Sequence, residues 1–455
     1  MRAAPLLLLL AVAVPAAGAP PAPAEDPAKL LQAFFKAKKE EDRAKARAAV
    51  EAVAPLEAKG IPALRESILK AMAKAGRSVP PKGRNEWFQF PKKEQEEREK
   101  RKLGNGLFYS QHNGTKGLVL GLHGGGVGSG DAGSAQSAFS GVVGSLGLSG
   151  IYPEVLEKTE CGWIDPPETE RWVMELVKRA RVSWGVDPDR IYVTGHSMGG
   201  FGAWIFGSHY ADAFAGAAAF AGAPRIYWQP GRQDVAAEAV VEGYLPNLYN
   251  LPLFVFQSLD DQNVKAAANV FACRELKKLH ESDPKGWKFL YEEVDGLGHG
   301  FPKKGPKPGL EWTTGNVRDS RPEKIVWQPT REWKNTFYWL RWEKPWINSE
   351  LVATLDRARN AVDVVIKAPR SIDPRKTEAE RDSFVRGLSV YLDERVLDPA
   401  REVLVTVDGK TRFRGRPEAR LGTLLRSCEE REDPAYAFAL EARCGDVIEA
   451  AATGK

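Results

Sequence analysis

The residues best suited to chemistry lie in DPDRIYVTGHSMGG, residues 187–200. Residues 190–194 have the apolar pattern of a buried strand, Ser197 is the centre of a G-x-S-x-G motif, and small residues begin a helix at Gly200. A serine on a sharp turn between a strand and a helix projects its hydroxyl above the sheet, and the flanking glycines are required because Cβ atoms would crowd that turn. This stretch predicts that Ser197 is a nucleophile.

A serine hydroxyl is a weak nucleophile at neutral pH, so it needs a base to take its proton and an acid to orient that base. His299 is the candidate base, because its glycine-flanked loop, DGLGHGF, follows a strand-like run and can reach a neighbouring turn. Asp260 and Asp261 are the candidate acids, since both follow the run LPLFVFQS. Val264, three residues after Asp261, fits the usual start of the next helix and favours Asp261, so Asp260 is expected to be a helix N-cap or a loop contact.

The glycine-rich stretch HGGGVGSGDAG, residues 123–133, allows two interpretations. Gly128 begins a G-x-G-x-x-G pattern and Glu154 lies about twenty residues further on, as in loops that bind dinucleotides. That pattern should begin at a strand end, however, and Gly128 stands six residues beyond Leu122, where an apolar run ends. The letters HGGG at 123–126 match instead a turn that offers backbone N–H groups to an oxyanion. We therefore expect an oxyanion turn.

The composition of the chain limits the classes of protein to which it can belong. With 455 residues it is long enough for two or three domains, and its 43% apolar and 27% charged residues indicate folded structure. The net charge of +5 is the remainder of 65 basic and 60 acidic residues spread along the chain. We therefore expect no nucleic-acid partner.

The first 24 residues have the pattern of a signal peptide. Arg2 gives a positive start, an apolar run follows at 6–14, and cleavage is expected after Ala19 or Ala24. This run is much shorter than the roughly 20 residues that span a bilayer, and we find no later run of that length, so we expect no membrane span. The sequence predicts a secreted or periplasmic protein.

Four cysteines, Cys161, Cys273, Cys428 and Cys444, are compatible with two disulfides in an oxidising compartment. Pairing of Cys428 with Cys444 is favoured because both lie in the last segment. Free buried thiols are the alternative. None of the four has the spacing of a zinc site, so we expect no structural metal.

Residues 25–103 are expected to form a helical segment and a linker. Helical spacing of apolar residues continues from 26 to 75, broken near Pro55 and Pro62, and the proline-rich and then charged residues 76–101 are typical of a linker.

From residue 104 to 310, short apolar runs alternate with helical patterns, which predicts a mostly parallel sheet covered on both faces. The expected strands are 118–122, 150–155, 190–194, 214–220, 253–258 and 288–294.

Residues 311–455 are expected to form a small β-rich C-terminal domain. Alternating runs predict strands at 361–367, 388–392, 402–407 and 411–415. Asp408-Gly409 is typical of a hairpin turn. Nearly half of the 13 tryptophans lie at 312–346, where burial in a seam between two domains is favoured over exposure for sugar stacking.

Residues 104–300 resemble the α/β-hydrolase family, in particular secreted esterases related to polyhydroxybutyrate depolymerases and feruloyl esterases. The motifs that carry the likeness are GLVLGLHGGG, VDPDRIYVTGHSMGGFGAW, LPLFVFQSLDDQNV and DGLGHGF. The likeness implies an α/β-hydrolase fold, with Ser197 as nucleophile, Asp261 as acid and His299 as base. One departure is that Gln-Ser stands where the strand before the acid usually continues into His-Gly.

The same likeness implies that the oxyanion is held by backbone N–H groups. Met198 would give one donor and the glycine turn another, from Gly124 or Gly125, with Gly126 as the remaining alternative. No metal and no cofactor are needed for this chemistry.

The function expected is that of a serine carboxylic-ester hydrolase acting through an acyl-enzyme. The substrate would be a small-molecule or polymer-linked ester, with a polysaccharide ester expected by analogy. Two alternatives stay open: a serine peptidase of prolyl-oligopeptidase type, and a non-catalytic carbohydrate-binding or envelope protein on a hydrolase scaffold. The sequence gives no oligomeric state.

Overall fold

The structure is a computed structural model that describes most of residues 26–445. The segments outside the description are 1–25, 102, 126–128, 158–161, 164–166, 229–236, 370–376 and 446–455, and the side chains of 167 and 377–379. The expected signal peptide and Cys161 therefore lie outside the described residues.

An eight-stranded sheet forms the centre of the molecule, in the order β1-β2-β4-β3-β5-β6-β9-β10. All neighbours are parallel except at β2, which runs antiparallel to both of its partners. The strands are β1 (Lys82–Glu86), β2 (Leu107–Gln111), β3 (Leu118–Leu122), β4 (Ser149–Pro153), β5 (Ile191–His196), β6 (Gly216–Phe220), β9 (Leu253–Ser258) and β10 (Phe289–Val294). β3, β4, β6 and β9 are buried along their whole length, as expected for parallel strands covered on both faces.

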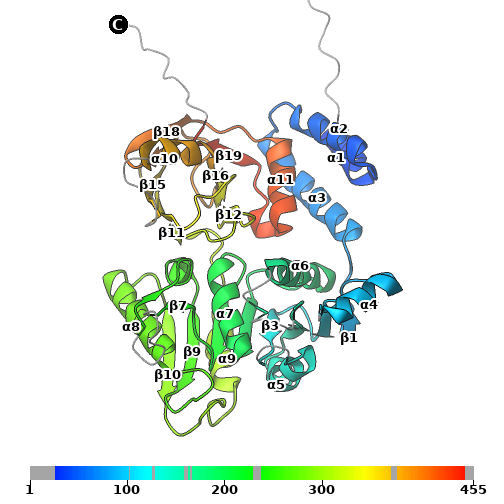
Figure 1. The fold of residues 1–455 in the computed structure, drawn as a ribbon. Coiled ribbons are helices and arrows are strands. Elements are labelled where there is room, and N and C mark those ends of the chain that lie inside the picture. Colours follow the sequence, from blue (N-terminus) through cyan, green and yellow to red (C-terminus); the bar gives the residue numbers. More distant parts are fainter. Residues whose placement is uncertain are drawn as a thin grey trace, which may run out of the picture.

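Helices cover both faces of this sheet (Figure 1). Side chains alternate between two cores: Val119 and Tyr192 pack with α5 (Ala132–Ser145) and α9 (Lys307–Thr314), whereas their neighbours Leu120 and Val193 pack with the helices of the opposite face. The helices of that opposite face are α6 (Pro167–Trp184), α7 (Met198–His209) and α8 (Ala267–Ser282). The predicted α/β-hydrolase fold is confirmed.

Two smaller sheets and two helices make up the C-terminal part, so the predicted β-rich character is also confirmed. Asp408 and Gly409 join β17 to β18 with φ of 51° and 77°, as the sequence predicted for a hairpin turn. The first sheet holds β11 (Lys324–Trp327), β14 (Glu350–Asp356), β15 (Ala361–Lys367), β17 (Val403–Val407) and β18 (Lys410–Gly415). The second holds β12 (Thr336–Phe337), β13 (Leu340–Trp342), β16 (Leu388–Leu392) and β19 (Leu440–Arg443), and the helices are α10 (Thr377–Arg386) and α11 (Leu421–Arg431).

The N-terminal helices pack on α11, at the other end of the sequence (Figure 1). They are α1 (Pro27–Lys36), α2 (Glu40–Glu51) and α3 (Ile61–Ala75). Phe34 and Ile68 are fully buried in one cluster with Leu421 and Leu424 of α11. Burial of this apolar surface explains why three short helices stay in place.

The expected linker at 76–101 contains regular structure, so that prediction is wrong. Lys82–Glu86 is strand β1, paired with β2, and Lys92–Lys100 is helix α4. β1 reads KGRNE and alternates between exposed and half-buried residues, because it is an edge strand without a core-facing apolar row. Hydrophobic periodicity therefore carries no signal there.

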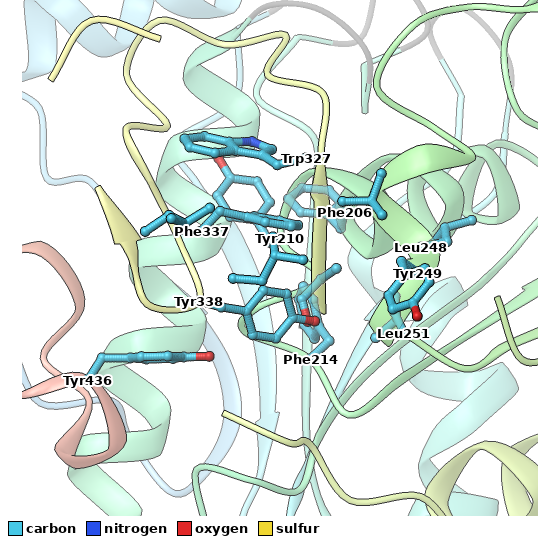
Figure 2. Close-up of a cluster of buried hydrophobic side chains, with 14 of the residues drawn as sticks. Phe206, Tyr210, Phe214, Leu248, Tyr249, Leu251, Trp327, Phe337, Tyr338 and Tyr436 are labelled. Carbon is cyan, nitrogen blue, oxygen red and sulfur yellow. The ribbon is translucent and has the colours of Figure 1, made fainter. Parts of the chain in front are cut away.

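The C-terminal part packs on the hydrolase sheet through aromatic side chains, in a contact that we call the seam (Figure 2). Trp327 and Phe337 belong to the same buried cluster as Phe206 of α7, and the Tyr338 hydroxyl donates to the Ala211 carbonyl. Trp339, Trp342 and Trp346 are buried as well, which confirms the predicted burial for four of the six tryptophans.

Charged side chains are also buried in the seam. Asp212, at 2% exposure, accepts hydrogen bonds from Lys334 at 2.9 Å and Arg431 at 2.6 Å. Arg181 of α6 pairs with Asp433 at 2.7 Å, across the same contact. Burial lowers the pKa of Lys334 to about 8.

The disulfide expected between Cys428 and Cys444 is not formed, because Cys428 is a free, buried thiol. Its side chain belongs to the cluster around α1–α3 and α11, whereas Cys444 belongs to the central core. Cys273 is likewise free and buried in α8, which leaves the thiol alternative in place for both.

Among the described helices, none combines the length and the apolar character needed to cross a membrane.

Candidate active site

Ser197 lies on a strained turn between β5 and α7. Its φ of 58° and ψ of −124° are uncommon for a residue with a side chain. A Cβ on Gly195 would lie 2.2 Å from the Gly199 carbonyl oxygen, and one on Gly199 would lie 2.2 Å from the Leu122 carbonyl oxygen. Since no side chain fits at either position, the two glycines of the motif are required by packing.

The three side chains predicted from strand ends lie in hydrogen-bonding contact. Ser197 Oγ is 2.8 Å from His299 Nε2, and His299 Nδ1 is 2.8 Å from Asp261 Oδ2. The Asp261 side chain is fully buried, and its second oxygen accepts the N–H groups of Asn263 and Val264 at 2.8 and 2.9 Å. With the carboxylate held by these bonds, Nδ1 of His299 carries its proton and Nε2 can accept the serine proton.

Asp260, the alternative acid, does not contact the imidazole in the structure. Its Oδ1 accepts instead the backbone N–H groups of Gly296 and Gly298, in the loop that carries His299. These bonds and the Ser258 hydroxyl hold the pKa of Asp260 below its usual value. The geometry therefore places Asp261 at the ring and Asp260 at the loop backbone.

The glycine turn at Gly124 and Gly125 lies against the turn at Ser197, which we call the elbow. A Cβ on Gly124 would be 3.2 Å from the Ser197 Cβ, and Gly125 has a φ of +117° that favours glycine. Met198 is the first residue of α7, where an N–H has no partner within the helix. Gly124 and Met198 therefore lie beside the serine, and Gly126 lies outside the described residues.

His123 anchors this turn, a role that the sequence reasoning did not assign. Its Nε2 accepts the Val155 N–H at 3.2 Å, so the proton lies on Nδ1, which donates to the Gly124 carbonyl at 2.8 Å. The Trp163 indole N–H donates to the His123 carbonyl at 3.0 Å. The partners come from the segment after β4, so no local pattern in the sequence could reveal them.

Carboxylates already occupy the helix terminus that a dinucleotide would need. Glu154 is buried and accepts the Ala132 N–H at 3.2 Å, and Asp131 accepts the Ser134 N–H at 2.7 Å, both in the first turn of α5. A pyrophosphate binds at such a position through the same N–H groups, and two carboxylates would repel it. The rejection of the dinucleotide interpretation therefore agrees with the contacts.

A pocket of about 280 Å³ adjoins the glycine turn. His196 lines it, with its ring 4.4 Å from the ring of Phe301, and burial together with His299 lowers the pKa of His196. The other lining residues are Leu122, His123, Gly124, Gly125, Gly130, Ser134, Ala135, Ala138 and Phe139. His196 thus forms a neutral wall beside the site, which fits a role in shaping the elbow.

Gln257 stands where related enzymes were expected to have histidine, and it braces the turn that carries both aspartates. It is fully buried, and its amide N–H group donates to the carbonyls of Ser258 and Val264 at 2.9 and 3.1 Å. Its amide oxygen accepts from Asn269 of α8 at 2.8 Å. Gln257 therefore connects the turn of Asp260 and Asp261 to α8.

Within the described part of the chain, no group of three or more His, Cys, Asp or Glu side chains is placed to hold a metal ion.

Comparison with known proteins gives a family match to part of the chain. The Esterase family model, described as "Putative esterase", matches residues 170–285, a segment that contains Ser197 and Asp261. Poly(3-hydroxyalkanoate) depolymerase C of Paucimonas lemoignei is 32% identical over 84 residues, which are 16% of this chain and 20% of that protein. The chain thus matches about a fifth of the length of this relative.

Solved structures of esterases overlap with part of the chain. A thermostable esterase has a TM-score of 0.35 at 20% identity, covering 47% of this chain and 60% of its own. Acetyl xylan esterase from Aspergillus awamori has a TM-score of 0.37 at 13% identity, covering 51% and 99%. The fold assignment itself rests on the strand order and the elbow. The chain is thus built on an α/β-hydrolase sheet whose elbow segment, residues 170–285, is similar to esterases.

Proposed function

We propose that the protein is a serine esterase in which Ser197, His299 and Asp261 form the catalytic triad. The observation that carries the proposal is the continuous relay from Ser197 Oγ through His299 to Asp261, with both contacts at 2.8 Å. The relay starts on a strained elbow beside a glycine turn, the arrangement that acyl transfer requires.

In the proposed reaction, Ser197 Oγ attacks the ester carbonyl while Nε2 of His299 takes the hydroxyl proton. Buried Asp261 stabilises the imidazolium that forms. The oxyanion is held by the N–H groups of Met198 and of Gly124 or Gly125, each worth about 3 kcal/mol of barrier. His299 then protonates the leaving alcohol, and water attacks the acyl-serine by the reverse sequence to release the acid.

The position of the C-terminal part supports an accessible site. Ser197 precedes α7, whereas the seam lies at the other end of that helix, where His209 contacts Thr330. The twelve residues of α7 separate the two by about 18 Å. In the part of the chain that the structure describes, the N-terminal helices pack on α11. An alcohol part as large as a polymer could therefore approach the serine.

The substrate class proposed is an ester with a small acyl group on a bulky alcohol, such as a polysaccharide or another polymer. The pocket of about 280 Å³ beside the glycine turn supports the small acyl part. Export of the protein to the periplasm or medium, proposed from the first 24 residues, would place the enzyme where such polymers occur.

A fluorophosphonate probe and p-nitrophenyl acetate test the proposal. Wild-type protein should be labelled and should hydrolyse the ester, and Ser197→Ala should lose labelling and about 10⁴- to 10⁶-fold of kcat with an unchanged melting temperature. Labelling that survives in Ser197→Ala would refute the serine assignment. A wild type that neither reacts nor hydrolyses would favour the non-catalytic alternative, and turnover of chromogenic dipeptides alone would favour a peptidase.

A further inference from the structure

The loop that carries His299 packs on the core through Leu297 and Phe301, but the two glycines before the histidine have no side chain to pack. Gly296 and Gly298 have positive φ values of 79° and 55°, and a Cβ built on either would meet no atom within 4 Å. The segment before it, β10, is the last strand of the sheet and is nowhere fully buried. Hydrogen bonds of the backbone therefore add to this packing where the glycines precede His299.

Three successive backbone N–H groups of this loop are bound by two side chains of the neighbouring turn. Gly296 and Gly298 donate to Asp260 Oδ1 at 3.1 and 3.0 Å. Leu297, between them, donates to the Ser258 hydroxyl at 3.2 Å, and that hydroxyl donates to Asp260. The carboxylate strengthens these bonds because it is charged, and the hydroxyl both accepts and donates.

We propose that Asp260, together with Ser258, is a positioning residue that holds the loop so that His299 Nε2 stays within reach of Ser197 Oγ. The proposal rests on the proposed function, since it assigns a role in the same triad. Asp261 orients the imidazole through its Nδ1, and Asp260 fixes the backbone one residue before it. Two adjacent carboxylates on one turn thus bind the same histidine segment, Asp261 at the ring of His299 and Asp260 at the backbone beside it.

The turn is itself rigid enough to act as a reference point. Ser258 is fully buried, and Gln257 ties the turn to Asn269 in the first turn of α8. Asn269 also donates to the Gly222 carbonyl, at the end of β6 beside the elbow. The turn, the elbow and the histidine loop are therefore connected by hydrogen bonds through side chains that do not take part in the relay.

Asp260→Ala is the main test, with Asp260→Asn as the conservative variant and Asp295→Asn as the matched control. Asp295 is exposed in the same loop, so its change removes a nearby charge and leaves the hydrogen bonds of Asp260 and Ser258 in place. We expect Asp260→Ala to lower kcat roughly 10- to 100-fold with little change in KM, because a misplacement of about 1 Å costs rate and not binding. Asp260→Asn keeps an acceptor oxygen and should recover most of that kcat, and Asp295→Asn should match the wild type.

Two further measurements separate positioning from stability. The labelling rate with the fluorophosphonate probe should fall in parallel with kcat, at a temperature well below the melting transition of every variant. Amide hydrogen exchange at 296–298 should become faster in Asp260→Ala and in Ser258→Ala, while exchange in β9 stays unchanged.

The possible outcomes are distinct. Wild-type kcat and labelling in Asp260→Ala would overturn the positioning role and leave the proposed triad intact. A loss of kcat in Asp295→Asn as large as that in Asp260→Ala would also overturn it, since the charge and not the hydrogen bonds of Asp260 would then matter. A wild type without labelling or hydrolysis would remove the proposed function and the positioning role together.

Discussion

The two edges of the central sheet differ in how far they bury their polar side chains. At the carboxyl edge, His299 contacts Ser197 and Asp261, yet its side chain keeps 20% of its surface exposed. At the amino edge, Asp212 is buried between Lys334 and Arg431, and all three belong to the seam. The His299 side chain therefore keeps a surface that a substrate can reach, whereas the Asp212 carboxylate is enclosed by its partners.

The pockets follow the same distinction. The pocket at the seam, about 380 Å³, is lined by charges that pair with one another, and the faces of its aromatic rings are covered by arginine and lysine side chains, as Arg431 covers Tyr436 and Arg171 covers Trp333. The smaller pocket beside the glycine turn adjoins the elbow. Of these two pockets the one at the seam is the larger, so volume does not identify the pocket that lies beside the turn of Ser197.

After Ser197→Ala, the largest expected effect at the carboxyl edge comes from Asp261→Asn. An amide would donate to His299 Nδ1 and force the wrong tautomer, so kcat should fall about 10⁴-fold. The melting temperature should stay close to that of the wild type, because the side chain keeps its shape and one acceptor. Steady-state kinetics and calorimetry check both parts, and a kcat within tenfold of the wild type would contradict the assignment of Asp261.

The opposite pattern is expected at the seam. Asp212→Ala leaves Lys334 and Arg431 buried without their carboxylate, which should cost about 3–5 kcal/mol of unfolding free energy. Denaturant unfolding measures the loss, and kcat at low temperature should be unchanged because Ser197 lies at the far end of α7. Lost activity in fully folded Asp212→Ala would show that the two edges are coupled.

A smaller effect should appear in the pH dependence of stability. Lys334 has its pKa lowered from 10.5 to about 8, so between these values the unfolded chain binds more protons than the folded one. Wild-type stability should therefore rise with pH through this window, and Lys334→Met should remove that part of the rise. Melting temperatures from pH 7 to 10 check this, with Lys324→Met, on a half-exposed lysine, as control. Parallel curves for the wild type and Lys334→Met would contradict it.

Much of the carboxyl edge could be predicted because its residues follow strand ends in the sequence. Ser197, Asp261 and His299 each follow an expected strand, and a parallel sheet brings such positions together. Their contact is in the structure, and their catalytic roles stay predictions. The hydrogen bonds from the loop to Asp260 and Ser258 could not be predicted from the sequence, because they depend on the directions of backbone N–H groups.

Contacts between distant segments were the main source of error. The pairing of Cys428 with Cys444 was chosen from closeness in sequence, but the two side chains enter different cores. The polar strand β1 and the charged helix α4 carry no apolar periodicity, so the residues between 76 and 101 were expected to be a linker. Pairing of β1 with β2 supplies backbone hydrogen bonds that side-chain patterns do not encode.

The packing of α1–α3 on α11 has a consequence for the order of events during synthesis. Arg47 of α2 forms its ion pair with Glu429, 382 residues later, so the N-terminal helices leave the ribosome long before their partner exists. The central sheet is complete at β10, well before α11 is made. Because contacts so far apart form slowly, we expect the sheet to fold first and the beginning of the chain to reach its final place last.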